Sequence, residues 1–556
     1  MPYHSRWSVT IPPCTLPTWI FGSPGATLPD TDPIFIDAER PDTYSFSLHA
    51  YREWSQRLAV GLQNAGLKHG DRVLVFSENN IFYPIIFMGI IMAGGIFTGT
   101  NPTYLQAELA HQLRDSGAKF MFCNENQLKT GLNAADTVGM AHDHVFVFNA
   151  QMAAGGTIGN SCKDLASLLA PVYQASMFKW EEFDTIEDNR TVCLNYSSGT
   201  TGVPKGVEIT HYNYVANCIQ FIYQIELDPD EIRKRSRDRQ ICFLPLYHAM
   251  AQTIFLAVRP KRRVPLWIMR KYTLPGLLQN IERFRINDLL LVPSVLVAMA
   301  KSQITRTFDL SSVERVMCGA APLGREACEV FEQLWPAGKI NVKQGWGMTE
   351  ATCSVLAWHP CELSLSFSVG EPSANCEIKL VDSDEAATEI RDHNVPGEIW
   401  VRAPNVMKGY WHNPQATAEV LTTDGWLKTG DIGFVDEQGK VYIVDRKKEL
   451  IKVRGNQVAP AELEAVLIRH PNIVDAAVVG VTINGEEAPR AYIVPWKPMT
   501  ADDVKEYMKQ HVSRIKYLTG GVIFIDAIPK NPSGKIVRKI LRDRAKEEIR
   551  SVQPRL

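Results

Sequence analysis

Hydrophobic and polar positions follow two alternating patterns up to about residue 440. Short apolar runs typical of buried strands stand at residues 72–77, 120–123, 145–148, 289–292 and 316–318. Segments such as residues 105–116, whose apolar positions recur with helical spacing, lie between such runs. Strands that alternate with helices in this way predict βαβ units and mostly parallel sheets.

The most apolar segment is residues 81–98, which contain no charged side chain. Pro84, Gly89, Gly94 and Gly95 interrupt it, and a membrane-spanning helix needs about 20 predominantly apolar residues. We therefore expect a buried helix that leads into a buried strand, and no transmembrane segment.

The pattern changes twice toward the C-terminus. Strands near residues 376–381 and 397–401, separated by polar turns, predict a small antiparallel barrel or sheet. After the charged run at 445–449 the order becomes helix, strand, strand, helix. The expected helices are residues 459–470 and 500–512, and the expected strands are residues 475–481 and 491–494.

This change of pattern predicts two domains in an α/β protein of several subdomains. Residues 1–447 are expected to form a large N-terminal domain of βαβ sheets plus the small barrel. Residues 448–556 are expected to form a smaller α+β domain, and its length of about 110 residues is within the usual range for a domain.

Composition narrows the class of protein further. The chain has 556 residues, of which 59 are Lys or Arg and 61 are Asp or Glu, giving a formal charge of −2. This balance excludes a polycation that coats nucleic acid, so we expect no nucleic-acid partner. The 11 cysteines include no C-x-x-C pair, which predicts free thiols in a reducing compartment. The first residues lack the apolar core of a secretory leader.

The strongest local motif is YSSGTTGVPKG at residues 196–206. Glycines allow backbone N–H groups to approach a phosphate, while hydroxyls and one lysine supply further donors and a positive charge. A Ser/Thr/Gly stretch is by itself more often a surface turn. The segment also departs from the common P-loop, which requires GxxxxGK followed by Ser or Thr.

Three further segments could contribute to a nucleotide site. PKNPSGK at residues 529–535 presents Lys535 on a tight turn before a basic helix. QGWGMTE at residues 344–350 offers an indole for stacking and a Thr/Glu pair suited to Mg²⁺ shared with phosphates. TGD at residues 429–431 places a carboxylate after a glycine turn. Each of the last two is weak alone, because a Trp between glycines is often a packing residue.

Together and in this order, these segments resemble the adenylate-forming superfamily, which includes acyl-CoA synthetases, plant 4-coumarate:CoA ligases, beetle luciferases and peptide-synthetase adenylation domains. FLPLYH at 243–248, GAAPLG at 319–324, GWLKTGD at 425–431 and the block at 445–464 add to the resemblance. It covers roughly residues 45–545 and implies a stand-alone AMP-forming acid:CoA ligase that uses ATP, Mg²⁺ and coenzyme A.

The resemblance implies a role for each matching residue in the first half-reaction, in which a carboxylate attacks the α-phosphorus of ATP. Lys535 would be the catalytic cation, Glu350 and Thr200 would hold Mg²⁺, and Trp346 would stack on adenine. Asp431 and Arg446 would hold the ribose. The remaining residues implied to bind ATP or AMP are Ser197, Ser198, Gly199, Thr200, Thr201, Gly202, Lys205, Gly319, Ala320, Ala321, Gln344, Gly345, Gly347, Met348 and Thr349.

In the second half-reaction the thiol of coenzyme A attacks the acyl-adenylate, and a rotating small domain would supply the different surroundings that this step needs. The resemblance places Lys448 at the hinge. Lys452, a further catalytic candidate, would then face the site together with Arg454, Gly455 and Gln457. His248 would be a gate between the acyl pocket and the thiol tunnel, with a positioning role favoured over that of a general base.

The acyl-pocket candidates suggest an apolar acid. They are Tyr247, Met250, Ile254, Gly319, Gly345, Gly347, Cys353 and Ser354, and the small residues among them would leave room for a ring or a chain. Plant hydroxycinnamate ligases typically have Tyr and a small hydroxylated residue where this chain has Met250 and Ile254. The departure favours a medium-chain aliphatic or less oxygenated aryl acid over 4-coumarate.

Alternatives to a free acid:CoA ligase remain open. The acyl group could be delivered to a carrier protein acting in trans, and an oxygenation of the luciferase type has no residue that selects for it. From another class, the chain could be an inactive nucleotide or acyl-adenylate sensor, although Lys535, Glu350, Asp431 and Lys205 together argue against a sensor. The final Pro554-Arg555-Leu556 resembles a peroxisomal tripeptide but departs from S-K-L, so the cytoplasm and the peroxisome are both expected locations.

Overall fold

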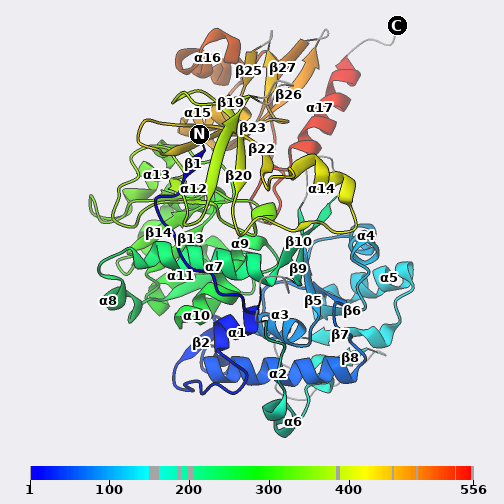
Figure 1. Cartoon of the computed structure of the whole chain (residues 1–556). Helices are drawn as coiled ribbons and strands as arrows, with labels where there is room; N and C mark the ends of the chain where they lie inside the picture. The colour runs from blue at the N-terminus through cyan, green and yellow to red at the C-terminus, as the bar shows by residue number, and fades with distance from the viewer. Residues whose placement is uncertain are drawn as a thin grey trace.

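The computed structural model describes residues 2–148, 162–183, 185, 190–197, 204–382, 388–453, 456–483, 486–532 and 534–552. Two large sheets with their helices make up the lower part of the molecule, and the C-terminal segments, orange to red, lie at the top (Figure 1). The expected α/β class with a small antiparallel sheet and an α+β C-terminal unit is confirmed. The domain boundary after residue 447 stays a prediction.

The first large sheet has eight strands in the order β21-β10-β9-β5-β4-β6-β7-β8. It is parallel from β9 to β8, and β10 is antiparallel to both of its neighbours. The strands expected at 72–77, 120–123 and 145–148 all lie in it. Its bounds are β4 Arg72–Phe76, β5 Ile96–Thr100, β6 Phe120–Asn124, β7 Val145–Phe148, β8 Lys163–Asp164, β9 Thr191–Ser197, β10 Lys205–Thr210 and β21 Gly409–Tyr410.

Helices connect and cover these strands. They are α2 Leu48–Asn64, α3 Tyr83–Met92, α4 Gln106–Ser116, α5 Leu128–Val138 and α7 His211–Glu226. Every residue of α3 is buried, which confirms the interpretation of residues 81–98 as a core helix that leads into β5. A Cβ on Gly89 would stand 2.8 Å from Leu58 of α2, so glycine allows the two helices to pack closely. No helix in the described ranges is long and apolar enough to cross a membrane.

The second large sheet has seven strands in the order β15-β14-β13-β11-β12-β2-β3, all parallel except for the β2–β3 pair. Its strands are β2 Pro33–Asp37, β3 Ser45–Ser47, β11 Gln240–Cys242, β12 Leu266–Ile268, β13 Asp288–Leu291, β14 Arg315–Cys318 and β15 Lys343–Gln344. Helices nearby are α1 Leu16–Phe21, α6 Val172–Met177, α8 Glu231–Arg235, α11 Leu274–Phe284, α12 Pro293–Lys301 and α13 Arg325–Glu332.

One helix follows directly after His248 and bears on the site. It begins as α9 Ala249–Thr253, widens into a π-helical turn at Ile254–Val258, and ends as α10 Arg259–Arg262. At its far end the buried Arg259 pairs with Asp288 at 3.2 Å, and the buried Arg262 pairs with Glu231. Breaking one partner of a buried ion pair is strongly destabilising, so these pairs anchor the helix whose other end carries His248.

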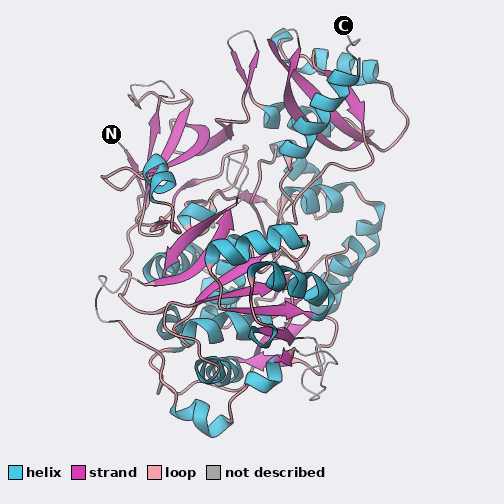
Figure 2. Ribbon diagram, turned by 90° about the vertical axis from the view of Figure 1, so that its right-hand side faces the viewer, coloured by secondary structure: helices cyan, strands magenta, loops and turns pink. Residues whose placement is uncertain are grey.

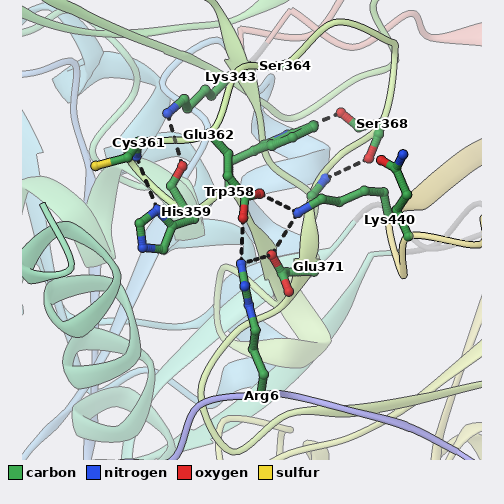
Figure 3. A network of polar contacts seen from close by, with 12 residues as sticks. Arg6, Lys343, Trp358, His359, Cys361, Glu362, Ser364, Ser368, Glu371 and Lys440 are labelled. Carbon is green, nitrogen blue, oxygen red and sulfur yellow. Dashed lines mark hydrogen bonds and ion pairs between the residues drawn. The ribbon is translucent and has the colours of Figure 1, made fainter.

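The expected small barrel or sheet is a six-stranded antiparallel sheet that also recruits the N-terminus. Its strands are β1 Tyr3–His4, β18 Glu377–Val381, β19 Glu389–Ile390, β20 Gly397–Arg402, β22 Leu427–Val435 and β23 Val441–Arg446. Just after β1, Arg6 donates to Glu362 at 2.7 Å and to Glu371 at 2.8 Å. Lys440 donates to the same two carboxylates from the β22–β23 turn (Figure 3). The network fixes the N-terminus and the segment at 358–371 against this sheet.

Smaller elements complete the large part of the chain. Strands β16 Leu356–Ala357 and β17 Glu371–Pro372 pair with each other, and helix α14 Pro414–Val420 follows β21. In Figure 2 the antiparallel sheet lies toward the N label and the C-terminal unit lies toward the C label, both at the top of the view.

The C-terminal unit contains the expected order of helix, strand, strand and helix, followed by one more strand and helix. Its elements are β24 Ile451–Val453, β25 Asn456–Val458, α15 Pro460–Arg469, β26 Ile473–Ile483, β27 Glu486–Pro495, α16 Ala501–His511, β28 Gly521–Phe524 and α17 Arg538–Val552. Helices α15 and α16 contribute to one apolar cluster of this unit and α17 to another, on β26 and β27. The last helix is therefore half packed, with Leu541 and Ala545 buried.

Polar groups form part of the contact between the C-terminal unit and the large part of the chain. The Lys301 ammonium at the end of α12 donates to the carbonyls of Ile468 at 2.9 Å and Ile473 at 2.6 Å. Arg469 at the end of α15 forms an ion pair with Glu326 on α13. The exposed Arg469–Glu326 pair contributes little to stability.

Candidate active site

The Lys535 ammonium lies in the electrostatic field of Glu350, Asp431 and Arg446, three residues far apart in sequence. Burial, together with the positive charge of Arg446, lowers the pKa of Lys535 to about 8, while the two carboxylates act in the opposite direction. A lysine whose pKa is perturbed by burial together with specific charged neighbours is a candidate functional group. The structure thus brings together the predicted cation, the predicted metal ligand and the predicted ribose pair.

A tight turn presents Lys535. Its backbone N–H donates to the Asn531 side chain at 2.9 Å, and its carbonyl accepts from the Asn531 backbone at 2.9 Å. Gly534 has a φ of +82°, and a Cβ there would stand 2.8 Å from Oγ of Ser294. Glycine is therefore required twice, by the left-handed backbone and by the close approach to the large part of the chain.

Glu350 receives hydrogen bonds from two elements of the first sheet. The Ser197 hydroxyl, at the end of β9, donates to its Oε1 at 2.9 Å. The Tyr410 hydroxyl, on β21, donates to the same oxygen at 3.1 Å. Lys205 begins β10, opposite Ser197 in the hairpin register, and its ammonium lies 5.1 Å from the centre of the Tyr410 ring. Tyr410 was not predicted from the sequence as a site residue.

Asp431 is buried beside Arg446 and Trp346. The sheet register places Asp431 directly opposite Arg446, and their nearest charged atoms are 3.4 Å apart. The indole Nε1 of Trp346 donates to Oδ2 at 2.9 Å. Burial raises the pKa of Asp431, whereas Arg446 and the indole N–H act to lower it. The three residues predicted to hold the nucleoside are thus one connected group.

The ends of β14 and β15 supply the remaining nucleotide candidates. Gly319 and Ala320 follow β14, and Ala320 has a φ of +76°, a strained conformation for a residue with a Cβ. On β15, the buried Nε2 of Gln344 has no hydrogen-bond partner among the described residues. An unpaired buried donor is costly, so this amide fits a ligand with an acceptor atom, such as adenine. Ala321, Gly345, Met348 and Thr349 lie partly exposed in the same two loops.

His248 stands at the start of α9 and is uncharged in the neutral range. Burial and the nearby Lys535 lower its pKa to about 3. An imidazole with so low a pKa is a poor base at neutral pH. The electrostatics therefore favour the positioning role over the general-base role.

Four other acyl-pocket candidates are Met250, Ile254, Tyr247 and Gly345. Met250 lies close to Gly319, because a Cβ on that glycine would be 3.5 Å from the Met250 sulfur, while Ile254 is buried at the π-helical turn. Tyr247 is partly buried and packs on Gly99. A Cβ on Gly345 would meet only Leu356 O, at 3.5 Å.

Gly347 is closely packed on its Cβ side. A Cβ there would stand 1.8 Å from the carbonyl oxygen of Cys353. This glycine is therefore needed for close packing of two backbone segments, and its place in the acyl pocket stays a prediction. Beside it, the backbone of Ser354 exchanges hydrogen bonds with the Asn217 side chain, and burial raises the pKa of the Cys353 thiol to about 12.

The residues assigned to the thioester step are not brought to Lys535 in this arrangement. Lys452 and Gln457 are exposed partners on the β24–β25 hairpin, and the Lys452 N–H donates to Glu487 of β27 at 2.7 Å. Figure 1 shows β25 at the top of the molecule, away from α9. Lys448 is exposed between β23 and β24.

Several predicted residues lie outside the described ranges. They are Ser198, Gly199, Thr200, Thr201 and Gly202 of the phosphate loop, Arg454 and Gly455 of the hairpin, and the final Pro554, Arg555 and Leu556.

A buried amide pair that sequence reasoning missed joins β9 to α9. Asn195 and Gln252 each donate to the other's side-chain oxygen, at 3.1 and 3.3 Å. Gln252→Met is expected to lower the free energy of unfolding by about 1–3 kcal/mol, since it leaves the Asn195 amide unpaired. Urea unfolding followed by tryptophan fluorescence measures this. Asn195→Leu combined with Gln252→Met should cost less than the sum of the single changes; additive losses would contradict the pairing.

The lowered pKa of Lys535 predicts a basic limit of activity. A cation that binds phosphate must be protonated, and deprotonation of a lysine increases as the pH rises through its pKa. We expect kcat/KM for ATP in pyrophosphate exchange to fall above pH about 8. No acid-side loss from His248 is expected above pH 5, because its pKa is about 3. A kcat/KM that stays flat to pH 10 would contradict the assignment.

Comparison with known proteins adds independent information. The profile of the family described as AMP-binding enzyme matches residues 26–411, and that of the AMP-binding enzyme C-terminal domain matches residues 462–535. A 4-coumarate-CoA ligase of Narcissus pseudonarcissus is 37% identical over 505 residues, covering 89% of this chain and 88% of the relative. A phenylacetyl-CoA ligase of Aspergillus niger is 36% identical over 559 residues, covering 98% of this chain and 100% of the relative.

Solved structures with the same fold include ATP-bound MatB from Rhodopseudomonas palustris, with a TM-score of 0.79, 24% identity, and coverage of 96% of this chain and 99% of that one. An anthranilate CoA ligase in complex with anthranoyl-AMP has a TM-score of 0.82 and 21% identity, covering 96% of this chain and 98% of that one. At these identities the likeness shows a shared fold.

Proposed function

Because the chain belongs to the AMP-binding enzyme family, we propose that it is an ATP-dependent acid:CoA ligase that activates an apolar aryl or medium-chain carboxylic acid. Relatives that are 36 to 37% identical over nearly the whole chain are named CoA ligases, and an AMP-forming acid–thiol ligase is the activity that they support. The observation that carries the proposal for this chain is the meeting of Lys535 with Glu350, Asp431 and Arg446.

In the first half-reaction a carboxylate oxygen of the acid bonds to the α-phosphorus of ATP, and the bond to the leaving pyrophosphate breaks. Negative charge on the phosphoryl oxygens must be stabilised by positioned cations. Lys535 is placed to do so from the C-terminal turn, and Lys205 can contact phosphate oxygens from the start of β10. Trp346, Gln344, Asp431 and Arg446 would orient the nucleoside.

The donor groups present fit a divalent cation shared with ATP. Mg²⁺ is usually held by one or two carboxylates plus substrate phosphates. Glu350 offers one buried carboxylate, which accepts hydrogen bonds from Ser197 and Tyr410. When bound, Mg²⁺ would neutralise charge on the phosphates.

In the second half-reaction the sulfur of coenzyme A bonds to the acyl carbonyl carbon, the bond to AMP breaks and the thiol proton is lost. The present arrangement, with Lys535 inside the site and Lys452 exposed elsewhere, suits only the first half-reaction. We place the hinge at Lys448, so that rotation of residues 448–556 would withdraw Lys535 and bring the β24–β25 hairpin to the site. The polar contacts that Lys301 and Arg469 make between the two parts of the chain are consistent with such rotation.

The acid class follows from the side chains near His248. Met250 and Ile254 give this wall an apolar surface, and Met adapts to ligands of different shape. An acid with few polar substituents would therefore leave no buried polar group unpaired.

Pyrophosphate release with ATP, Mg²⁺ and a panel of aliphatic and aryl acids tests the proposal. Each acid is run with and without coenzyme A. Multiple-turnover release only in the presence of coenzyme A supports the ligase and identifies its acid class. Release that is insensitive to coenzyme A would point instead to a carrier-protein acceptor, and no release with any acid would favour the sensor.

A further inference from the structure

Tyr410 contacts two oppositely charged side chains, Lys205 and Glu350. The first is proposed to bind ATP phosphate and the second to bind the divalent cation. The Tyr410 hydroxyl donates to Oε1 of Glu350 at 3.1 Å, and its ring faces the Lys205 ammonium at 5.1 Å from the ring centre. Aromatic faces attract ammonium groups at this distance. One tyrosine thus contacts the lysine with its face and the carboxylate with its hydroxyl.

The backbone fixes this ring firmly. Tyr410 pairs with Val207 across the β21–β10 register, and the next residue, Trp411, donates its N–H to the Gly206 carbonyl at 2.8 Å. The Tyr410 N–H donates to the Thr417 hydroxyl at 2.9 Å. Lys205 begins the same β10 strand. The pairing of β21 with β10 therefore fixes the tyrosine and the lysine relative to each other.

Without a group between them, a half-buried lysine and a buried carboxylate attract each other strongly, since the local dielectric is well below that of water. A direct ion pair would occupy the donor intended for phosphate and the acceptor intended for the metal. Lys205 and Glu350 form no such pair in the part of the chain that the structure describes, and Tyr410 contacts both of them, the ammonium with its ring face and the carboxylate with its hydroxyl.

We propose that Tyr410 is a positioning residue that keeps Lys205 and Glu350 apart, so that the ammonium stays available to ATP phosphate and the carboxylate to the divalent cation. The inference rests on the proposed function, because it assumes that MgATP binds at this site. It adds a role for a residue that makes no contact with the reacting atoms.

The test measures MgATP binding by calorimetry on the full-length protein. Tyr410→Ala removes both ring and hydroxyl and is expected to weaken MgATP binding by about 10-fold, a loss on the scale of one strong charged contact. Tyr410→Phe keeps the ring and loses only the hydrogen bond to Glu350, so a loss of about 3-fold is expected. AMP binding, which depends on Trp346 and Asp431, should stay within about 2-fold in both variants and reports an intact fold.

Repeating the measurement in the Glu350→Gln variant separates this role of Tyr410 from a merely structural one. In Glu350→Gln there is no carboxylate to capture Lys205, so adding Tyr410→Ala should weaken MgATP binding by less than a further 3-fold or so. An equal loss in both backgrounds, or no loss in the wild-type background, would overturn the proposal. If Tyr410→Ala fails to bind AMP, Tyr410→Leu, which preserves bulk without an aromatic face, takes its place in the same cycle. Failure of the wild-type protein to bind MgATP would instead refute the proposed function.

Discussion

Replacing Lys535 by alanine is expected to reduce carboxylate-dependent ATP–pyrophosphate exchange by about 100-fold or more, the scale for removing one preorganised charge donor from a transition state. Lys535 is held by the Asn531 turn close to Glu350 and Asp431. The measurement is isotope exchange between pyrophosphate and ATP at saturating acid.

Two comparisons sharpen this experiment. Lys530→Ala alters the same turn but removes a lysine that pairs with Asp475 at 2.6 Å within the C-terminal unit, and exchange should stay near the wild-type rate. The Lys535→Ala variant should still convert a supplied acyl-adenylate to thioester, because Lys535 takes no part in that step. Exchange near the wild-type rate in Lys535→Ala would remove this lysine from the mechanism.

Replacing Lys452 by alanine is expected to have the opposite selectivity. Lys452 is exposed on the β24–β25 hairpin in the present arrangement, so exchange should be unaffected. Thioester formation should fall by roughly 10- to 100-fold, the range for a lost positioning contact at the reacting centre. Single-turnover conversion of a preformed acyl-adenylate with coenzyme A measures the second step alone.

Lys505 provides a matched control for this variant. It is an exposed lysine on α16 of the same unit, and it pairs with its helix neighbour Asp502 at 3.3 Å. Lys505→Ala should leave both half-reactions unchanged. Equal losses of exchange and thioester formation in Lys452→Ala would contradict the two-orientation account, since they would mean that the hairpin serves both steps in one arrangement.

Most of the fold could be predicted because its strands are short, apolar and bounded by turn residues. The expected strand at 72–77 is β4 Arg72–Phe76, and the expected helix at 105–116 is α4 Gln106–Ser116. Residues 81–98 could be interpreted correctly because glycine and proline interrupt them at positions that a membrane span does not favour. Such signals are local. A local preference predicts the folded structure when it agrees with the burial of the same residues.

The contacts of the site were less accessible to sequence reasoning. Glu350 and Asp431 stand in recognisable motifs, but nothing near Tyr410 indicates that its hydroxyl will meet a carboxylate 60 positions away in the chain. In the sequence, Asn195 and Gln252 are ordinary polar residues. Their pairing is apparent only once β9 and α9 are packed together. The close approach of Gly347 to the Cys353 carbonyl was inaccessible for the same reason, because what a glycine packs against depends on the folded chain.

The buried thiol of Cys353 has a consequence for the fidelity of thioester formation. An acyl-adenylate acylates a nearby thiolate, and a cysteine beside the predicted acyl pocket could take the acyl group before coenzyme A arrives. Burial raises the pKa of the Cys353 thiol to about 12, so far less of it is ionised at pH 7 than of an ordinary thiol, of which a few per cent is thiolate. If Cys353 lines the acyl pocket as predicted, its raised pKa would protect the protein from acylating its own thiol.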